Sequence, residues 1–126
     1  MTVALHFARI GSAALFGSLA AQAALAAPLP KPASFAMCGV CHKVASGEKS
    51  TIGPNLWGVN GRKAGTLPGF IYSNPMKASN ITWTRAELLD YIAAPAKKVP
   101  GTKMAYAGQK DPKQAALIVD YVLSLK

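Results

Sequence analysis

The chain is poor in the side chains that most metal and redox sites require. Its 126 residues include two cysteines and two histidines, and one histidine lies in the apolar N-terminal segment. Beyond that segment only Cys38, Cys41 and His42 are nitrogen or sulfur ligands of the usual kind. A structural zinc site needs four such ligands, so this sequence argues against one.

The first 26 residues have the layout of a secretory signal peptide, with cleavage expected near residues 23–27. Arg9 ends a short n-region, and residues 10–20 are mostly Ala, Leu, Gly and Ile. The alternative is a membrane anchor, because residues 10–27 are nearly long enough to span a bilayer. Their alanine-rich content would make a weak span, so we expect a periplasmic protein with one mature domain over residues 27–126.

Acidic residues are also scarce, since five Asp and Glu stand against 14 Lys and Arg. Of these charged residues only Arg9 lies before residue 28, so removal of the leader leaves a formal charge of +8. Such a charge suits nucleic acid, a membrane surface or acidic proteins. An exported chain rarely meets nucleic acid, and we therefore expect acidic protein partners.

The two cysteines and the remaining histidine lie together in Cys38-Gly39-Val40-Cys41-His42. This C-x-x-C-H spacing is typical of covalent haem attachment. The thiols can add to the two vinyl groups of a porphyrin, and the histidine can then present its imidazole to the iron. A thioredoxin-like pair would need a βαβ setting, which the proline-interrupted residues 31–37 do not provide. A disulfide across two residues would close a small, strained loop, so the motif predicts one heme c.

Apolar spacing predicts short helices, with no convincing strand and no internal repeat. The clearest begin at Thr84, which opens a capping-box pattern, and at Asp111, which precedes a proline. Glycine and proline punctuate residues 51–69 and 96–108, which we expect to be loops. The prediction is a small all-α fold of three to five short helices, with long loops wrapped round one covalent haem. The expected helices cover residues 34–44, 74–79 with Asn74 as cap, Thr84 to Pro95, and Asp111 onward.

If the iron is six-coordinate, its second axial ligand is expected to be a methionine or a lysine, because the mature chain has no histidine other than His42. The methionine candidates are Met37, Met76 and Met104, and Met37 is too close to Cys38 to reach the opposite face. Met104 lies in a Pro-Gly loop 62 residues beyond His42. A lone methionine is more often core filler, but a polar loop after a rigid turn is an unusual place for filler. Histidine and methionine together raise the potential of the iron.

These segments together resemble class I cytochrome c, in the group of mitochondrial cytochrome c and bacterial cytochrome c2. They recur in the family's order and spacing from Cys38 to near the C-terminus. The matching segments are Cys38 to His42, Gly53-Pro54-Asn55-Leu56, Gly61-Arg62-Lys63, Pro68-Gly69-Phe70 with Tyr72, Ile81-Thr82-Trp83, Tyr91 before Pro95, and Pro100-Gly101-Thr102-Lys103-Met104.

The resemblance implies a role for each matching site residue. Cys38 and Cys41 would carry the haem, and His42 and Met104 would ligate its iron. The remaining expected roles are a Pro54 carbonyl that accepts the other ring N–H of His42, a Tyr91 hydroxyl that approaches the Met104 sulfur, and a haem propionate held by Arg62, Tyr72 and Trp83.

The resemblance also implies a soluble, monomeric electron carrier and not an enzyme. Its partners would be a cytochrome bc1 complex as donor and a terminal oxidase, reductase or reaction centre as acceptor. Docking would use a basic surface that includes Lys97, Lys103 and Lys110. One alternative is a tethered carrier that keeps residues 1–27 as an anchor. The other is an open-site haem domain with peroxidase-like activity, against which the sequence offers no distal histidine with a partnering arginine.

The chain departs from the family pattern at several positions. Pro30 and Ser34 stand where relatives have glycine and an aromatic residue, which predicts a short N-terminal helix. Met76 stands where many relatives have asparagine near the haem. Met37 and Thr51 occupy places that are often lysine, so the basic surface is incomplete.

Overall fold

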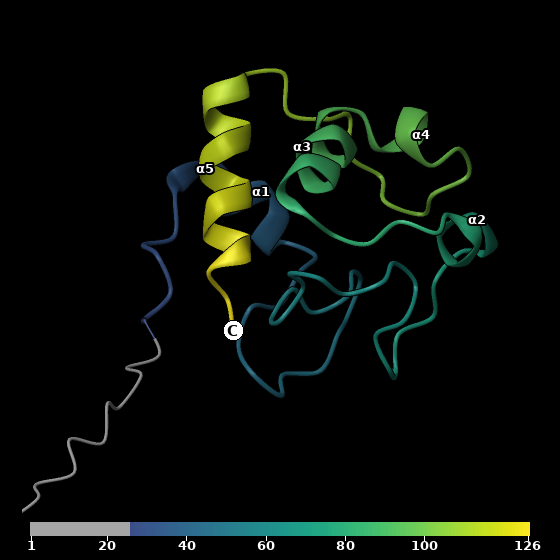
Figure 1. Cartoon of the computed structure of the whole chain (residues 1–126), viewed down its shortest axis with the longest axis horizontal. Helices are drawn as coiled ribbons and strands as arrows, with labels where there is room; N and C mark the ends of the chain where they lie inside the picture. Colours follow the sequence, from purple (N-terminus) through teal and green to yellow (C-terminus); the bar gives the residue numbers. More distant parts are fainter. Residues whose placement is uncertain (1–25) are drawn as a thin grey trace, which may run out of the picture.

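The computed structural model describes residues 26–126, and the predicted signal peptide lies outside the described residues apart from Ala26. Within them the fold is helical, with one isolated bridge between Lys63 and Thr82 in place of a strand. This confirms the predicted all-α class. No helix between residues 26 and 126 is long and apolar enough to cross a bilayer. The elements in chain order are a 3₁₀ turn, η1 (Ala33–Phe35), then α1 (Ala36–Gly39), α2 (Asn74–Ala78), α3 (Arg85–Ala93), α4 (Pro95–Lys98) and α5 (Pro112–Leu123) (Figure 1).

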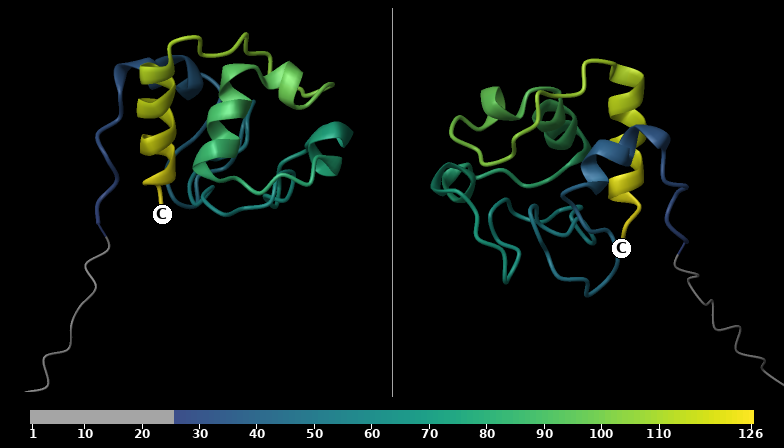
Figure 2. Two further views of the ribbon diagram at one scale, coloured as in Figure 1. Left: turned by 45° about the horizontal axis from the view of Figure 1, so that its top comes forward. Right: turned by 180° about the vertical axis from the view of Figure 1, so that it is seen from behind.

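Helix α5 is the longest element, and it begins where the sequence predicted. The Asp111 carboxylate accepts hydrogen bonds from the backbone N–H groups of Lys113 (2.8 Å) and Gln114 (3.4 Å). This satisfies two N–H groups that have no partner within the helix. Helix α5 packs on α3 and η1, as both views of Figure 2 show. Its buried face consists of Ala115, Ile118, Val119, Tyr121 and Val122.

The N-terminal helix is shorter than predicted, because residues 34–44 form only η1 and α1. The Cys38 carbonyl accepts the His42 N–H at 2.9 Å, which extends the turn by one residue. The Cys41 carbonyl instead accepts the Gly53 N–H at 2.9 Å. After this turn the backbone enters the long loop that leads to α2.

This short helix still packs on the C-terminal helix. Phe35 is 1% exposed, and its ring meets Tyr121 edge to face with centroids 5.0 Å apart. Such a pair contributes about 0.5–1.5 kcal/mol beyond its buried area. The preceding residues run beside α5 (Figure 2), where the Leu29 N–H donates to the Ser124 hydroxyl at 2.9 Å. The N-terminal segment is thus fixed to α5 despite the missing aromatic at position 34.

The cap of α2 differs from the prediction by one residue. Ser73, not Asn74, precedes the helix with extended backbone, and its hydroxyl accepts the Met76 N–H at 3.3 Å. Both residue types cap helices well. Ser73 is buried whereas Asn74 is exposed.

Helix α3 begins at the predicted cap, where the Thr84 hydroxyl accepts the Glu87 N–H at 3.3 Å. Pro95 ends it as expected, but the same proline opens α4 in a stretch predicted to be loop. Proline is tolerated in the first helical turn because its missing N–H needs no partner there. The Lys98 ammonium then holds α4 against α3 through Glu87 (2.9 Å) and Asp90 (3.3 Å).

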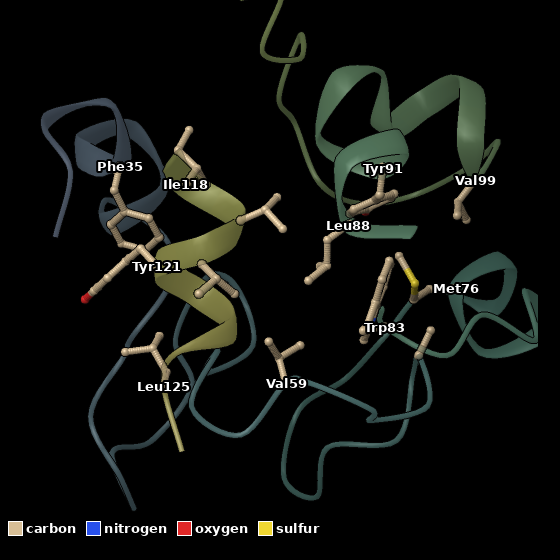
Figure 3. Packing of buried hydrophobic residues seen from close by; sticks show 13 residues of the cluster. Phe35, Val59, Met76, Trp83, Leu88, Tyr91, Val99, Ile118, Tyr121 and Leu125 are labelled. Atoms are coloured by element: carbon tan, nitrogen blue, oxygen red, sulfur yellow. The ribbon is translucent and has the colours of Figure 1, made fainter. Parts of the chain in front are cut away.

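The buried core joins α3 and α5 to the loops around them. Figure 3 shows Trp83, Met76, Tyr91 and Val99 in one group and Phe35, Tyr121 and Leu125 in another. The rings of Trp83 and Tyr91 have centroids 5.1 Å apart. Cys38 and Met104 are partly buried and pack against this core. The same core therefore supports both Cys38, at one end of the predicted haem site, and Met104, at the other.

Candidate functional site

The two cysteines lie within one turn at the end of α1. The Cys38 carbonyl accepts the N–H groups of Cys41 (3.1 Å) and His42 (2.9 Å). Both thiols are free and partly buried. Burial is the main cause that raises the pKa of the Cys38 thiol, and nearby Cys41 raises it further. The turn therefore presents two free thiols and one imidazole over a short length of backbone.

The His42 ring is oriented by the loop that follows it. Its Nδ1 lies 2.8 Å from the Pro54 carbonyl oxygen, which can only accept, so Nδ1 carries the proton. Burial lowers the pKa of the ring and keeps it neutral, although the Pro54 bond opposes this shift. The lone pair of the neutral ring therefore lies on Nε2, the atom required for a metal bond.

Gly53 makes this arrangement possible through its lack of a side chain. A Cβ at this position would lie 2.6 Å from His42 Cε1 and 2.7 Å from Nδ1. Real Cβ atoms essentially never approach other atoms that closely. The absence of a side chain at Gly53 therefore leaves room for the imidazole, which reaches the carbonyl of the next residue, Pro54.

Polar contacts of Asn55 and Arg62 hold the same loop in shape. The buried Asn55 side chain donates to the carbonyls of Ala45 (2.8 Å) and Glu48 (2.7 Å) and accepts the Trp57 N–H (2.8 Å). The Arg62 guanidinium donates to the carbonyls of Asn55 (3.0 Å) and Trp57 (3.2 Å). Each of these bonds gives a hydrogen-bond partner to a backbone carbonyl or N–H group of the loop, which has no partner within a helix.

The backbones of two residues expected at a propionate are bonded to each other, since the Trp83 backbone N–H donates to the Arg62 carbonyl at 2.9 Å. Burial lowers the pKa of Arg62, and the Tyr72 phenol opposes this shift. Burial raises the pKa of Tyr72, and the Arg62 guanidinium opposes that shift. The role of Arg62, Tyr72 and Trp83 at a propionate stays a prediction.

Met104 lies in a loop that is bonded to α3 through Thr102. The Tyr91 hydroxyl and the Thr102 hydroxyl are 2.8 Å apart, and Thr102 Oγ1 also accepts the Met104 N–H at 3.3 Å. Burial raises the pKa of Tyr91, and the Thr102 contact opposes this. The hydrogen-bond partner of the phenol in this structure is thus Thr102, while the predicted approach of Tyr91 to the methionine sulfur stays a prediction.

Met104 shares a compact turn with Tyr106, whose backbone N–H donates to the Met104 carbonyl at 3.0 Å. Burial raises the pKa of Tyr106, and the Cys38 thiol raises it further.

Comparison with known proteins identifies the family. The family model for cytochrome c matches residues 32–126. The chain belongs to the cytochrome c family. It is 47% identical over 94 residues to cytochrome c2 iso-2 of Magnetospirillum fulvum, which covers 75% of this chain and 97% of that protein. It is 44% identical over 88 residues to cytochrome c2 of Blastochloris viridis, which covers 70% and 69%.

A solved structure gives the same result. Cytochrome cH from Methylobacterium extorquens matches with a TM-score of 0.66 and 44% identity, covering 71% of this chain and 89% of that one. The chain is therefore an electron-transfer haem protein with one covalently bound heme c. The residues present are suited to hold heme c: the thiols are free, the His42 ring is oriented, and Gly53 has no side chain to obstruct the ring. When bound, heme c supplies a one-electron Fe(II)/Fe(III) couple.

Two residues that shape this site have roles that the sequence motifs do not predict. Gly53 stands directly before Pro54, and this position is the available signal. Thr102 stands two residues before Met104. In both cases the role depends on a contact across the chain, which residue spacing does not reveal.

Replacing Gly53 with alanine should destabilise the holoprotein by about 2–3 kcal/mol, as overpacked sites do. The new methyl group would force the His42 ring away from the Pro54 carbonyl. Guanidinium unfolding of the oxidised protein measures this loss. Pro54→Ala is the matched control, because it keeps the carbonyl and should cost much less. Equal stability of G53A and wild type would contradict the close packing described above.

Replacing Thr102 with valine should cost about 1–2 kcal/mol, because the Tyr91 hydroxyl and the Met104 N–H lose a partner. Thr102→Ser keeps the hydroxyl and should retain most of the stability. Thermal unfolding of the oxidised holoprotein compares the two variants. Similar losses in T102V and T102S would show that the methyl group of Thr102 matters more than its hydroxyl.

Proposed function

We propose that His42 and Met104 fill both axial positions of the iron, so that the protein carries single electrons without binding substrate there. The observation that supports this most is the His42 ring, whose Nδ1 is bonded to Pro54 and whose Nε2 carries the lone pair. Met104 belongs to a turn that is anchored through the Thr102 hydroxyl, which accepts the Met104 N–H at 3.3 Å. A neutral thioether ligand favours Fe(II) and raises the potential.

The remaining site residues would hold and orient the cofactor. Cys38 and Cys41 would form the thioether links, and the Pro54 carbonyl would keep His42 basic. Arg62, Tyr72 and Trp83 hold a propionate in a partly buried setting. Tyr91 positions the Met104 loop through Thr102, which keeps the sixth position closed. An enzyme of the peroxidase type would need that position open, so we assign no catalytic residue.

The proposed partners are a cytochrome bc1 complex as electron donor and a terminal oxidase, reductase or reaction centre as acceptor. Lys97 and Lys103 are exposed, and neither forms an ion pair within residues 26–126. Lys110 is exposed and donates to the Ala93 carbonyl at 3.0 Å. These positive charges would speed encounter with acidic partners, an effect that weakens with salt.

We place the mature domain, residues 27–126, in the periplasm after removal of residues 1–26 as a signal peptide. Residues 10–20 and the small residues that follow support this processing. The intact mass of the protein purified from its periplasmic fraction tests it. A mass equal to residues 27–126 plus one haem is expected, whereas a membrane-bound, full-length form would favour the tethered carrier.

Stopped-flow kinetics with purified complexes test the carrier function. A bacterial cytochrome bc1 complex should reduce the oxidised protein, and a terminal oxidase should oxidise the reduced form. Hydrogen peroxide should be turned over no faster than by free haem. Rapid peroxide turnover without reduction by the bc1 complex would replace the carrier with an enzyme.

A further inference from the structure

Helix α4 leads directly into the loop that carries Met104. It has four residues, Pro95–Lys98, which are too few for a helix that is stable by itself. Backbone bonds continue from it, since the Val99 N–H donates to the Pro95 carbonyl at 2.9 Å and the Thr102 N–H donates to the Val99 carbonyl at 3.0 Å. The Thr102 hydroxyl then accepts the Met104 N–H at 3.3 Å. A displacement of α4 would therefore be passed on through these bonds to Met104.

Two hollows border α4, so side-chain packing holds this helix only in part. Of its four residues only Pro95 is buried. One hollow, of about 490 Å³, is lined by Glu87, Lys98 and residues 79–82 among others. The second, of about 440 Å³, lies beside Lys97 and Lys98. Because Lys98 borders both hollows, the attachment of α4 on these sides depends on what its side chain binds.

The Lys98 ammonium bridges two carboxylates of α3, the helix beside α4 in Figure 1. It lies 2.9 Å from Glu87 Oε2 and 3.3 Å from Asp90 Oδ2. The two carboxylates are three residues apart, a spacing that places both on one face of a helix.

The contact between Lys98 and Glu87 is the more protected of the two. Glu87 Oε2 is buried, and no other group of residues 26–126 donates a hydrogen bond to it. Glu87 is also the main cause that raises the pKa of Lys98. Removal of the ammonium would leave a buried carboxylate oxygen without its counter-charge, which destabilises the arrangement more than the loss of an exposed pair would.

We propose that Lys98 is a positioning residue for the sixth iron position. By holding α4 on α3 it keeps the Met104 loop (residues 99–104) closed and slows the release of the methionine from the iron. The inference rests on the proposed function, since it takes Met104 as the ligand. It adds that three charged residues outside the proposed haem site, Lys98, Glu87 and Asp90, control how readily a foreign ligand reaches the iron.

Binding of imidazole to the oxidised holoprotein measures this opening. At high imidazole concentration the rate of binding no longer depends on concentration, because it is limited by the departure of Met104. Stopped-flow absorption follows the reaction. Lys98→Ala removes the ammonium, and Lys98→Arg restores a cation. Arg85→Ala is the matched control, because it breaks another ion pair of α3, the 2.8 Å contact of Arg85 with Asp120 on α5.

Lys98→Ala should raise the limiting rate about tenfold, an effect between those of exposed and buried ion pairs. Lys98→Arg should stay within about threefold of the wild-type rate, and Arg85→Ala should leave that rate unchanged. If K98A gives no holoprotein, Asp90→Asn decides, because this side chain is 68% exposed and its loss should raise the rate only about twofold.

A wild-type limiting rate in K98A, or in D90N where that variant decides, would overturn the role of Lys98 and leave Met104 as the ligand. An equal increase in R85A would also overturn it, since the cause would then be a general loss of stability. If the wild type binds imidazole with a rate that rises with concentration without limit, the sixth position is open. The proposed function then fails as well.

Discussion

Replacing Met104 with alanine is expected to lower the reduction potential by hundreds of millivolts and to open the iron to carbon monoxide. Axial ligands set haem potentials over a range of about 0.8 V, and a thioether lies toward its upper end. Without the sulfur, water or a nearby amine would occupy the position and favour Fe(III). Potentiometric titration, with carbon monoxide added to the reduced protein, measures both effects.

The other methionines provide the controls for this variant. Met37 is largely exposed and Met76 is 7% exposed within the core beside Trp83 and Val99. Met37→Ala should leave the potential and the carbon monoxide response unchanged. Met76→Ala should lower stability by about 2–5 kcal/mol through a cavity but keep the iron closed. An M104A protein with the wild-type potential would show that another side chain is the ligand.

Replacing Gly108 with alanine is expected to destabilise the fold by about 3–5 kcal/mol. A Cβ there would collide with the Ala93 carbonyl oxygen, a backbone atom at the end of α3 that cannot rotate away. The backbone also has a φ of +104°, which disfavours any side chain. The adjacent Gln109 N–H donates to the Ile92 carbonyl at 2.8 Å, so the segment is fixed in place.

Gly69 is the matched control for Gly108. Its φ is +79°, but a Cβ there would meet nothing within 4 Å. Gly69→Ala should therefore cost only the backbone strain, about 1 kcal/mol. Guanidinium unfolding of the two holoproteins measures the difference. A G108A variant as stable as G69A would mean that the end of α3 can move to make room.

The helical fold was predictable where local rules act without competition. Asp111 with Pro112 and Thr84 with Glu87 are capping patterns, and both mark the observed starts of α5 and α3. The spacing of Cys38, Cys41 and His42 predicted the cofactor because thioether attachment needs this order of residues. These features depend on neighbours within one or two turns, which the sequence displays directly.

Other features depended on contacts that local patterns do not contain. Helix α4 was missed because its short length gives no periodicity, and its attachment comes from Lys98 bonds to α3. The cap of α2 is Ser73, whose hydroxyl accepts the Met76 N–H, and not the neighbouring Asn74. The Phe35 ring reached Tyr121 from a position one residue away from the family's aromatic. Each outcome was decided by packing between segments far apart in the sequence.

In the candidate site, too, some features were predictable from the sequence and others depended on contacts between distant segments. The partner of Nδ1 in His42 was named from the family resemblance, but the role of Gly53 became visible only from the distance between its backbone and the ring. Likewise, the hydroxyl of Tyr91 meets Thr102 at 2.8 Å, a contact between residues that are 11 positions apart. Residue identity suggested which groups take part, and the folded chain determined which atoms meet.

The most direct test of His42 and Met104 as the two axial ligands is the optical spectrum of the purified protein, oxidised and reduced, with carbon monoxide added to the reduced form. The expected result is the weak far-red band of a Met–Fe(III) bond in the oxidised state, with no change on addition of carbon monoxide. Absence of that band together with ready carbon monoxide binding would contradict a closed, six-coordinate electron carrier.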